Sequence, residues 1–283
     1  YQCMLAQALN IKSNIEHRRS QNELGVLVWQ FNEIWPTGGW GSIEYGTPVA
    51  GQVLGGRWKP LHYLYRRSVF ADVMAACGGG GQCYVKNDLP GEPFKGTVTI
   101  SSLEFASGTR KVLKTLNVAL AEGAGASVRF SVDLSGVDPT AHLLIAECKR
   151  VAPASKAAAH ATRGDSPSVV RRTGAVKEEE TLSVNEMLFA PPSRLVLPPA
   201  NLSLAVAPQA NTDGSINVTV SSDATALYVT LTTLSQGRFS DNAFAMAPGR
   251  TLLTFVPLEG MKVLPSSLSA SLRVEHLQPH LFS

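Results

Sequence analysis

One apolar run near the start of the chain constrains the fold more than any other feature of the sequence. Residues 25–29 read Gly-Val-Leu-Val-Trp, with four consecutive apolar residues and no alternation with polar ones. This pattern is typical of a strand covered on both faces, as the parallel strands of α/β folds are. We therefore predict a buried parallel strand, which ends at Pro36.

Side chains that suit a sugar ligand lie at and beyond the end of this predicted strand. They are the amide of Asn32, the carboxylate of Glu33, and Trp29, Trp35 and Trp40, which are three of the four tryptophans in the chain. Barrel enzymes place their chemistry at the carboxyl ends of strands, and an indole face is an apolar platform that amides and carboxylates complete. The exit of this strand is therefore the candidate binding site.

Three ordered blocks around this strand resemble a known family. They are Trp-Gln-Phe-Asn-Glu-Ile-Trp-Pro at 29–36, Gly-Trp-Gly-Ser-Ile-Glu-Tyr-Gly at 39–46 and Gly-Arg-Trp-Lys-Pro-Leu-His-Tyr at 56–63. Their order resembles the β-mannosidases of glycoside hydrolase family 2. A fourth block, Gly-Arg-Phe-Ser-Asp-Asn-Ala-Phe at 237–244, resembles a signature of the last β-domain of the same family.

The resemblance implies the carboxyl-terminal portion of a retaining exo-β-mannosidase, an enzyme that removes terminal non-reducing β-D-mannose from oligosaccharides or glycoproteins. The family has a (β/α)8 catalytic barrel whose acid/base and nucleophile glutamates lie on earlier strands. Both would precede residues 1–20, so we expect no catalytic residue in this segment and no activity from it alone. The expected partners are a β-mannoside oligosaccharide and the upstream part of the same polypeptide.

The resemblance also assigns substrate-binding residues. Trp29 would face the sugar ring at the end of the last barrel strand, with core packing as its alternative role. Asn32 would hydrogen-bond the loop or the sugar, and Trp35 would pack under Trp40. The sequence departs from the family pattern at Glu33 (aspartate in the pattern), at position 39 (glycine for serine) and by an insertion at 47–55, which we interpret as a surface loop.

Three carboxylates near this site, at positions 23, 33 and 44, are tempting substitutes for the catalytic pair, but Glu23 precedes the strand and is at its wrong end. Glu33 and Glu44 match positions that the family keeps acidic without using them as that pair. We expect them to orient loops through backbone contacts or through Arg57.

Helices are predicted on both sides of the strand. Residues 1–20 carry apolar residues at helical spacing, and Pro60 suits the first turn of a second helix that continues to about Asp72. We expect Arg18 and Arg19 to be solvated or to pair with Glu16.

Short β segments dominate the rest of the chain. We predict strands at 96–100, 112–119, 127–132, 141–146, 181–189, 202–206, 215–220, 226–231, 251–256 and 268–274. The block at 237–244 is predicted to be a turn between strands, in which Asp241 and Asn242 bind local backbone.

The predicted fold class is multi-domain, α/β plus all-β. Residues 1–76 form the C-terminal part of a (β/α)8 TIM barrel, 77–193 a β-sandwich, and 194–283 an immunoglobulin-like β-sandwich. The Ala/Ser/Arg-rich and then acidic stretch at 153–180 is predicted to be a low-complexity insertion in the first sandwich.

Composition excludes several classes of function. The net charge of +3 comes from basic residues in or beside one low-complexity segment, which argues against nucleic-acid binding. No apolar run approaches the roughly 18 residues of a membrane span. The four cysteines show no metal-ligand spacing, so we expect no metal site and no cofactor.

Two features concern the compartment. Cys77 and Cys83 flank a glycine run and either close a small loop in an oxidising compartment or remain free thiols. Sequons at Asn201 and Asn217 permit glycosylation. Both features fit a lysosomal or secreted protein.

A second function stays open from the sequence. The β-sandwich domains could form a non-catalytic carbohydrate-binding or adhesion module. Glutamates at barrel strand ends in an upstream segment would favour the enzyme.

Overall fold

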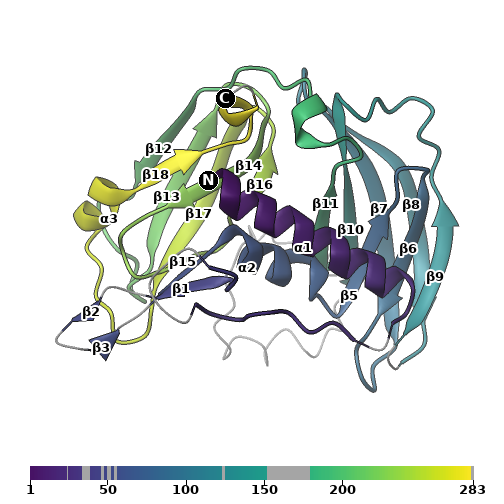
Figure 1. Cartoon of the computed structure of the whole chain (residues 1–283), viewed down its shortest axis with the longest axis horizontal. Coiled ribbons are helices and arrows are strands. Elements are labelled where there is room, and N and C mark those ends of the chain that lie inside the picture. Colours follow the sequence, from purple (N-terminus) through teal and green to yellow (C-terminus); the bar gives the residue numbers. More distant parts are fainter. Residues whose placement is uncertain are drawn as a thin grey trace, which may run out of the picture.

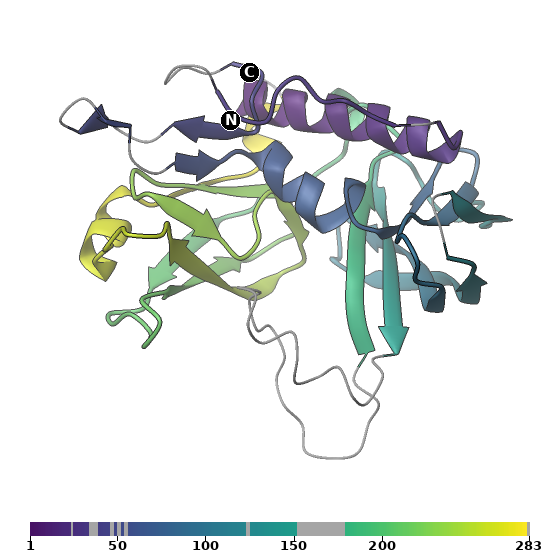
Figure 2. The ribbon, with the colours of Figure 1, turned by 90° about the horizontal axis from the view of Figure 1, so that it is seen from below.

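The computed structural model describes residues 1–23, 25–33, 39–45, 48–49, 52–53, 56–122, 125–151 and 179–281. Two β bodies lie side by side, and one long helix runs across both of them (Figures 1 and 2). The elements in chain order are α1 (Gln2–Ser20), β1 (Ile43–Tyr45), β2 (Pro48–Val49), β3 (Gln52–Val53), β4 (Gly56–Trp58), α2 (Pro60–Leu64), the π-helix η1 (Tyr65–Val69), β5 (Val73–Cys77), β6 (Gln82–Asn87), β7 (Phe94–Glu104), β8 (Arg110–Leu120), β9 (Ala126–Ser131), β10 (His142–Val151), β11 (Glu179–Met187), the 3-10 helix η2 (Pro192–Arg194), β12 (Leu202–Val206), β13 (Ile216–Ser222), β14 (Ala226–Thr232), β15 (Gly237–Phe239), β16 (Phe244–Met246), β17 (Gly249–Pro257), α3 (Pro265–Ser271), β18 (Arg273–Glu275) and the 3-10 helix η3 (Gln278–His280).

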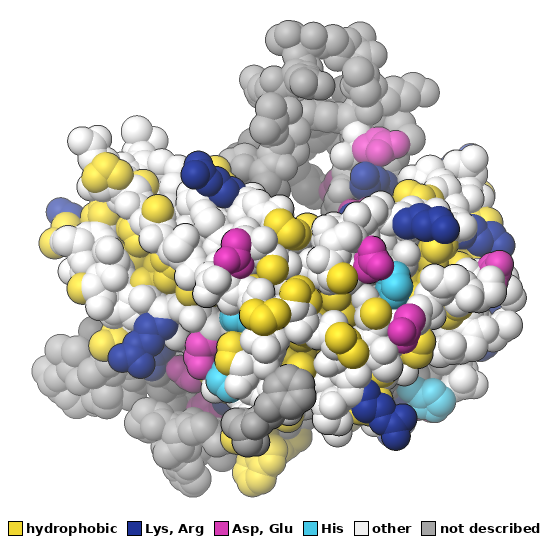
Figure 3. Space-filling model, turned by 90° about the horizontal axis from the view of Figure 1, so that it is seen from above, with side chains coloured by type: hydrophobic (Ala, Val, Ile, Leu, Met, Phe, Trp, Pro, Cys, Tyr) yellow, Lys and Arg dark blue, Asp and Glu magenta, His cyan; other side chains and the backbone are white. Residues whose placement is uncertain are grey.

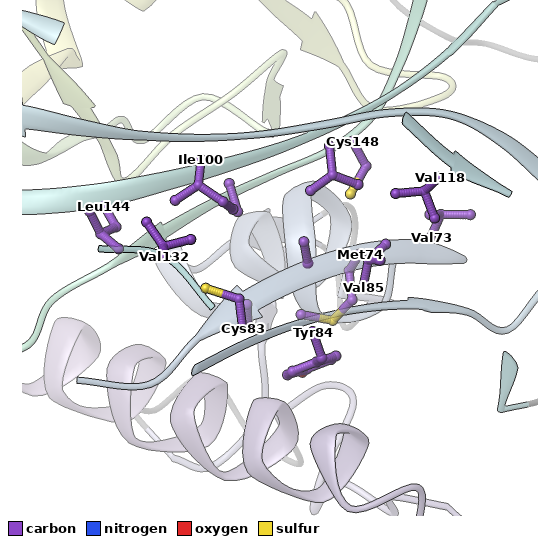
Figure 4. Packing of buried hydrophobic residues seen from close by; sticks show 14 of the residues in the cluster. Val73, Met74, Cys83, Tyr84, Val85, Ile100, Val118, Val132, Leu144 and Cys148 are labelled. Carbon is purple, nitrogen blue, oxygen red and sulfur yellow. The ribbon is translucent and has the colours of Figure 1, made fainter. Parts of the chain in front are cut away.

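The first β body is a sandwich of two antiparallel sheets. One sheet has the order β11-β10-β7-β8 and the other β5-β6-β9. Inward-facing side chains of both sheets form one buried apolar cluster, which includes Met74, Val85, Ile100 and Leu144 (Figure 4). Burial of this cluster is the main favourable term for this body. Its first strand, β5, begins at Val73, so the sandwich starts before residue 77.

A disulfide joins the two strands of the first hairpin in this sandwich. Cys77 and Cys83 are opposite each other in the β5–β6 ladder, and their sulfurs are bonded. Of the two states that the sequence left open, the structure has the disulfide.

The second β body is immunoglobulin-like. Its larger sheet has the order β1-β4-β15-β17-β13-β12, and its smaller sheet β16-β14-β18. Strand β13 alternates buried and half-buried residues, the pattern of a strand with one face on the core. Tyr63 of α2 also enters this core, where its hydroxyl accepts a 2.9 Å hydrogen bond from the Phe239 amide. The helical region and this body therefore share one apolar core.

The predicted strands of both sandwiches coincide with observed ones, with one exception. Residues 268–274, predicted to be a strand, form most of α3 and only the start of β18. Pro265 is in the first turn of α3, where its missing amide hydrogen costs nothing, and Leu268 is the buried residue of the helix. In the sequence, the apolar residues of this short helix resemble those of a strand.

The buried strand predicted at 25–29 is wrong for this structure. Residues 25–31 join no β ladder, Leu27 is fully exposed and Trp29 is 71% exposed. The segment first makes strand-like contact at Asn32, which forms a parallel bridge with Ile43. A strand needs a neighbour for its backbone groups, and the described residues place none beside this run. The described part of residues 1–76 therefore does not show the parallel sheet of a barrel fragment.

The two predicted helices are present. Helix α1 buries Leu5, Ala8, Lys12 and Ile15, at the 3-4 spacing of one helix face. The second helix starts at Pro60 as α2 and continues as the π-helix η1 to Val69.

Arg19 corrects the expectation for the basic end of α1. Its guanidinium donates to the carbonyls of Val69 and Ala71, at 2.8 and 2.9 Å, and to the Asp88 carboxylate at 2.6 Å. Arg19 is therefore a bridge between helix and sandwich, because the helix ends against β6. Arg18 remains exposed and pairs with Glu23.

Two sequence-based expectations fall largely outside the described residues. Of the insertion at 47–55, the structure describes only the short β2–β3 pair. Of the segment at 153–180, it describes the last two residues, at the start of β11. No helix among the described residues is long and apolar enough to cross a membrane.

Candidate functional site

A buried ion pair anchors the end of the predicted strand. The Glu33 carboxylate binds the Lys59 ammonium group, and the two side chains are only 3% and 2% exposed. Lys59 also donates to the Gly39 carbonyl at 3.1 Å, so one cation ties two chain segments together. A β-carbon at Gly39 would lie 2.4 Å from the Glu33 carboxylate. The glycine that departs from the family pattern therefore gives this carboxylate room.

A second polar contact fastens the same segment to α2. The Ser42 hydroxyl donates to the Phe31 carbonyl at 2.9 Å and lies 3.0 Å from Nδ1 of His62. Burial, with Arg66 nearby, lowers the pKa of His62 to about 4. His62 is thus neutral at physiological pH and holds Ser42 through a neutral hydrogen bond. Since Ser42 is fully buried, the pair is a structural contact and no nucleophile.

The structure locates two of the three predicted substrate-binding residues. Trp29 and Asn32 lie on one exposed segment, and the Trp29–Gln30 peptide bond is cis. The Asn32 amide donates to the Glu33 carbonyl at 3.1 Å, a local backbone contact. Trp35 lies outside the described residues. Whether these residues bind a sugar remains a prediction.

A large hollow opens beside this segment. It has a volume of about 640 Å³, and aromatic rings line it together with apolar residues of the segment 25–31. The rings belong to Phe31, Trp58, His62, Tyr65 and Phe70. The Tyr65 hydroxyl is buried and has no hydrogen-bond partner among the described residues. We call this feature the aromatic hollow.

The block at 237–244 does more than form a turn. Asn242 exchanges two hydrogen bonds with the backbone of Leu231, at 2.7 and 2.9 Å, so it does bind backbone, although of β14. Asp241 accepts from the Asn242 amide, as predicted, and from the Arg67 guanidinium at 3.0 Å. The block therefore connects the immunoglobulin-like body to η1.

Arg67 is the centre of a junction between all three parts of the chain. It belongs to η1, binds Asp241 of the second body and lies 3.2 Å from Glu186 in β11 of the first. It also donates to the carbonyls of Asn242 and Ala243. Burial raises the pKa of Glu186, and the charge of Arg67 opposes that shift.

Sequence reasoning missed Arg67 and Lys59. A buried glutamate at the strand exit requires a cation, which was a usable signal for Lys59. For Arg67 no local signal exists, because its partners are far away in sequence.

The two carboxylates Glu33 and Glu44 are both in ion pairs. Glu44 forms an ion pair with Arg57 at 3.2 Å, as expected from the sequence, and Glu33 binds Lys59. The described residues contain no cluster of metal-ligating side chains.

Comparisons with known proteins identify the relatives of this chain. A family model for the Ig-fold domain of mannosidases matches residues 197–279. The chain is 37% identical over 114 residues to β-mannosidase A of Aspergillus flavus, covering 37% of this chain and 11% of that protein. It is 40% identical over 76 residues to β-mannosidase of Capra hircus, covering 24% of this chain and 8% of that protein. The chain thus spans about a tenth of the length of these curated relatives.

Solved structures share the fold over almost the whole chain. The β-D-mannosidase of Dictyoglomus thermophilum matches with a TM-score of 0.65 and 22% identity, over 96% of this chain and 29% of that one. An exo-chitosanase of Amycolatopsis orientalis matches with a TM-score of 0.58 and 14% identity, over 97% of this chain and 33% of that one. In sequence blocks and in fold, the chain resembles the C-terminal portion of the β-mannosidases of glycoside hydrolase family 2, as its motifs predicted.

Proposed function

We propose that this chain is the C-terminal portion of a retaining exo-β-mannosidase. In such an enzyme one carboxylate attacks the anomeric carbon while a carboxylic acid protonates the leaving oxygen, and water then hydrolyses the glycosyl ester. Supporting this proposal, the chain aligns with less than a third of a β-D-mannosidase structure although almost all of its own residues align. The catalytic pair would come from the upstream part of the polypeptide.

The aromatic hollow carries this proposal. Leu27 and the Phe31 ring line it and are exposed, and the buried Tyr65 hydroxyl in its wall has no hydrogen-bond partner among the described residues. Soluble proteins rarely leave such an apolar surface uncovered. We propose that the remaining barrel elements cover it, and that residues 25–31 then become the last strand of a (β/α)8 barrel with residues 1–76.

The carboxylates of the described site fit a supporting role. Glu33 is neutralised by buried Lys59, and a nucleophile needs an accessible carboxylate. Glu44 forms an ion pair with Arg57, which is opposite it in the β1–β4 hairpin. We therefore propose that this segment shapes the substrate site, with Trp29 as an apolar wall and Asn32 and Trp35 beside it, and is inactive alone.

Compartment and partners follow from the same proposal. The Cys77–Cys83 disulfide supports an oxidising compartment, lysosomal or extracellular. On the face seen in Figure 3, basic and acidic side chains of the described residues are interspersed, which offers no continuous basic stripe for a nucleic acid. The proposed partners are a β-mannoside oligosaccharide and the upstream polypeptide.

One experiment tests both the activity and the placement of the barrel. The complete polypeptide should hydrolyse an aryl β-mannoside, and the 283-residue chain should not. Leu27→Asp should cost the complete protein about 3 kcal/mol or more of unfolding free energy, because it buries an unpaired charge. In this chain, where Leu27 is exposed, the same substitution should be nearly neutral. Turnover by the short chain, or equal effects of Leu27→Asp in both proteins, would contradict the proposal.

A further inference from the structure

A second hollow lies where the β1–β4 hairpin joins the rest of the immunoglobulin-like body. It has a volume of about 450 Å³ and is lined by both strands of the hairpin, by the end of β14 and by α3. We call it the hairpin hollow. The hairpin reaches the second body through a parallel contact between Arg57 and Gly237. The hollow is therefore formed by segments that are far apart in the sequence and fixed by the sheet.

The ion pair in this hollow has unused hydrogen-bonding capacity. Glu44 and Arg57 are opposite each other in the hairpin, and Nε of Arg57 donates to Oε2 of Glu44 at 3.2 Å. One guanidinium nitrogen, Nη1, donates to the Thr233 carbonyl at 3.4 Å. Among the described residues, nothing binds Oε1 of Glu44 or Nη2 of Arg57. Their side chains are 32% and 26% exposed, so a ligand reaches them without a large desolvation cost.

Further groups complete the wall. Thr232 lines the hollow from the end of β14, and no described residue hydrogen-bonds its hydroxyl. The Thr233 and Ser271 hydroxyls already bond each other at 2.8 Å. Leu234 lines the hollow as well and is 75% exposed, an apolar surface that nothing in the described structure covers.

Size and hydrogen-bonding groups select the class of ligand. Glu44 neutralises Arg57 and Glu33 neutralises Lys59, which leaves Arg273 as the remaining charged residue of the lining. A volume of about 450 Å³ lies within the range of small-molecule sites. An adjacent acceptor and donor, Oε1 and Nη2, match two neighbouring hydroxyls of a pyranose, one donating and one accepting. An apolar side chain such as Leu234 matches the C–H face of the same ring.

We infer that the hairpin hollow binds one neutral pyranose unit through Glu44, Arg57 and Thr232, with Leu234 against its C–H face. The choice of a saccharide as ligand depends on the proposed function, since it makes the unit part of a mannoside substrate. The binding itself needs no catalysis and no upstream segment.

Binding of mannobiose to the 283-residue chain tests the inference by saturation-transfer NMR. Glu44→Gln, which removes a charged acceptor, should weaken binding about tenfold or more. Thr232→Val keeps the shape of the side chain and should weaken it about twofold to tenfold. The matched control is Glu147→Gln, which breaks the Arg110–Glu147 ion pair of the other sandwich and should leave affinity unchanged. Melting temperatures of all variants report whether they fold.

The outcomes separate this inference from the proposed function. Absence of saturable mannobiose binding, or an equal loss with Glu147→Gln, would overturn the inference. A uronate disaccharide that binds tenfold tighter than mannobiose would also overturn it, because Arg273, which lines the hollow as well, would then select an anionic sugar. If the complete polypeptide lacks mannosidase activity but the chain binds mannobiose as expected, only the proposed function fails.

Discussion

Two stretches of similar composition have opposite fates in this molecule. Residues 25–29 contain four consecutive apolar residues and are not part of any ladder, and Leu27 and Trp29 are exposed. Strand β14 is equally apolar, and six of its seven residues are buried. The difference is in their neighbours, because β14 pairs with β16 on one side and with β18 on the other.

This comparison shows what an apolar run specifies. An apolar run indicates that a segment is buried in the folded protein, but it does not indicate which elements bury it. Strand β14 is buried by other elements of this chain. In the segment 25–29, Val26 and Val28 pack against the apolar cluster of the helices, and two polar anchors beyond its end, Glu33 with Lys59 and Phe31 with Ser42, hold it. We interpret it as a strand whose partners belong to another part of the polypeptide.

Hydrogen exchange should give the largest difference between the two stretches. Amides of 25–29 have no ladder partner and should exchange with opening free energies near zero, whereas those of β14 should open only with the whole domain. The expected difference in exchange rate is at least about a thousandfold. Mass spectrometry of peptides from both stretches measures it. Similar protection would show that 25–29 is already structured without partners and would break the comparison.

Arg67 offers a way to weaken the better-protected stretch. Arg67→Met leaves Glu186 buried without its cation and frees Asp241 beside the turn that holds β14. We expect a loss of about 3–5 kcal/mol in unfolding free energy, measured by chemical denaturation. Arg110→Met, which breaks a more exposed ion pair in the first sandwich, should cost less than about 1 kcal/mol.

Equal costs for these two substitutions would contradict the role of Arg67 as a junction. Arg67→Met should also speed hydrogen exchange in β14. The reason is that Asn242 accepts a hydrogen bond from the Leu231 amide through its side chain and another from Arg67 through its carbonyl.

The sequence predicted the two sandwiches better than the region that precedes them. Strands such as β13 and β17 could be located because their alternation and turns are local signals. Residues 268–274 could not, because a single proline at position 265 decides for a helix. The candidate site was predicted only in part. Glu44 with Arg57 followed from a motif, but the Arg67 junction depends on contacts more than a hundred residues apart.

Acid should loosen the anchored end of the segment 25–33. The pKa of His62 is lowered from 6.5 to about 4, so the unfolded chain takes up a proton first as pH falls. The contribution of His62 to the unfolding free energy is therefore constant above pH 6.5 and is lost as the pH falls from 6.5 to 4. Because the ring is only half-buried, we expect about 1 kcal/mol. Denaturation at pH 7 and at pH 4.5 measures the change.

Glutamine at position 62 isolates this contribution. His62→Gln should remove about 1 kcal/mol of the pH dependence, while other acidic groups titrate as before. An unchanged dependence would show that His62 does not carry the acid sensitivity.

The smallest effect in this chain is expected at Trp29. Because its side chain is 71% exposed, Trp29→Ala should change the unfolding free energy of the chain by less than about 0.5 kcal/mol. Trp58→Ala, which removes a ring packed against His62 and Tyr63, should cost about 2 kcal/mol or more and is the control. In the complete polypeptide a sugar-contacting Trp29 predicts a large loss of kcat/KM for alanine and a smaller one for phenylalanine, at nearly constant melting temperature. A core residue predicts instead a lower melting temperature, with normal turnover per folded molecule. Measuring kcat/KM and the melting temperature of both variants decides whether Trp29 contacts a sugar or packs against a neighbouring strand in the complete polypeptide.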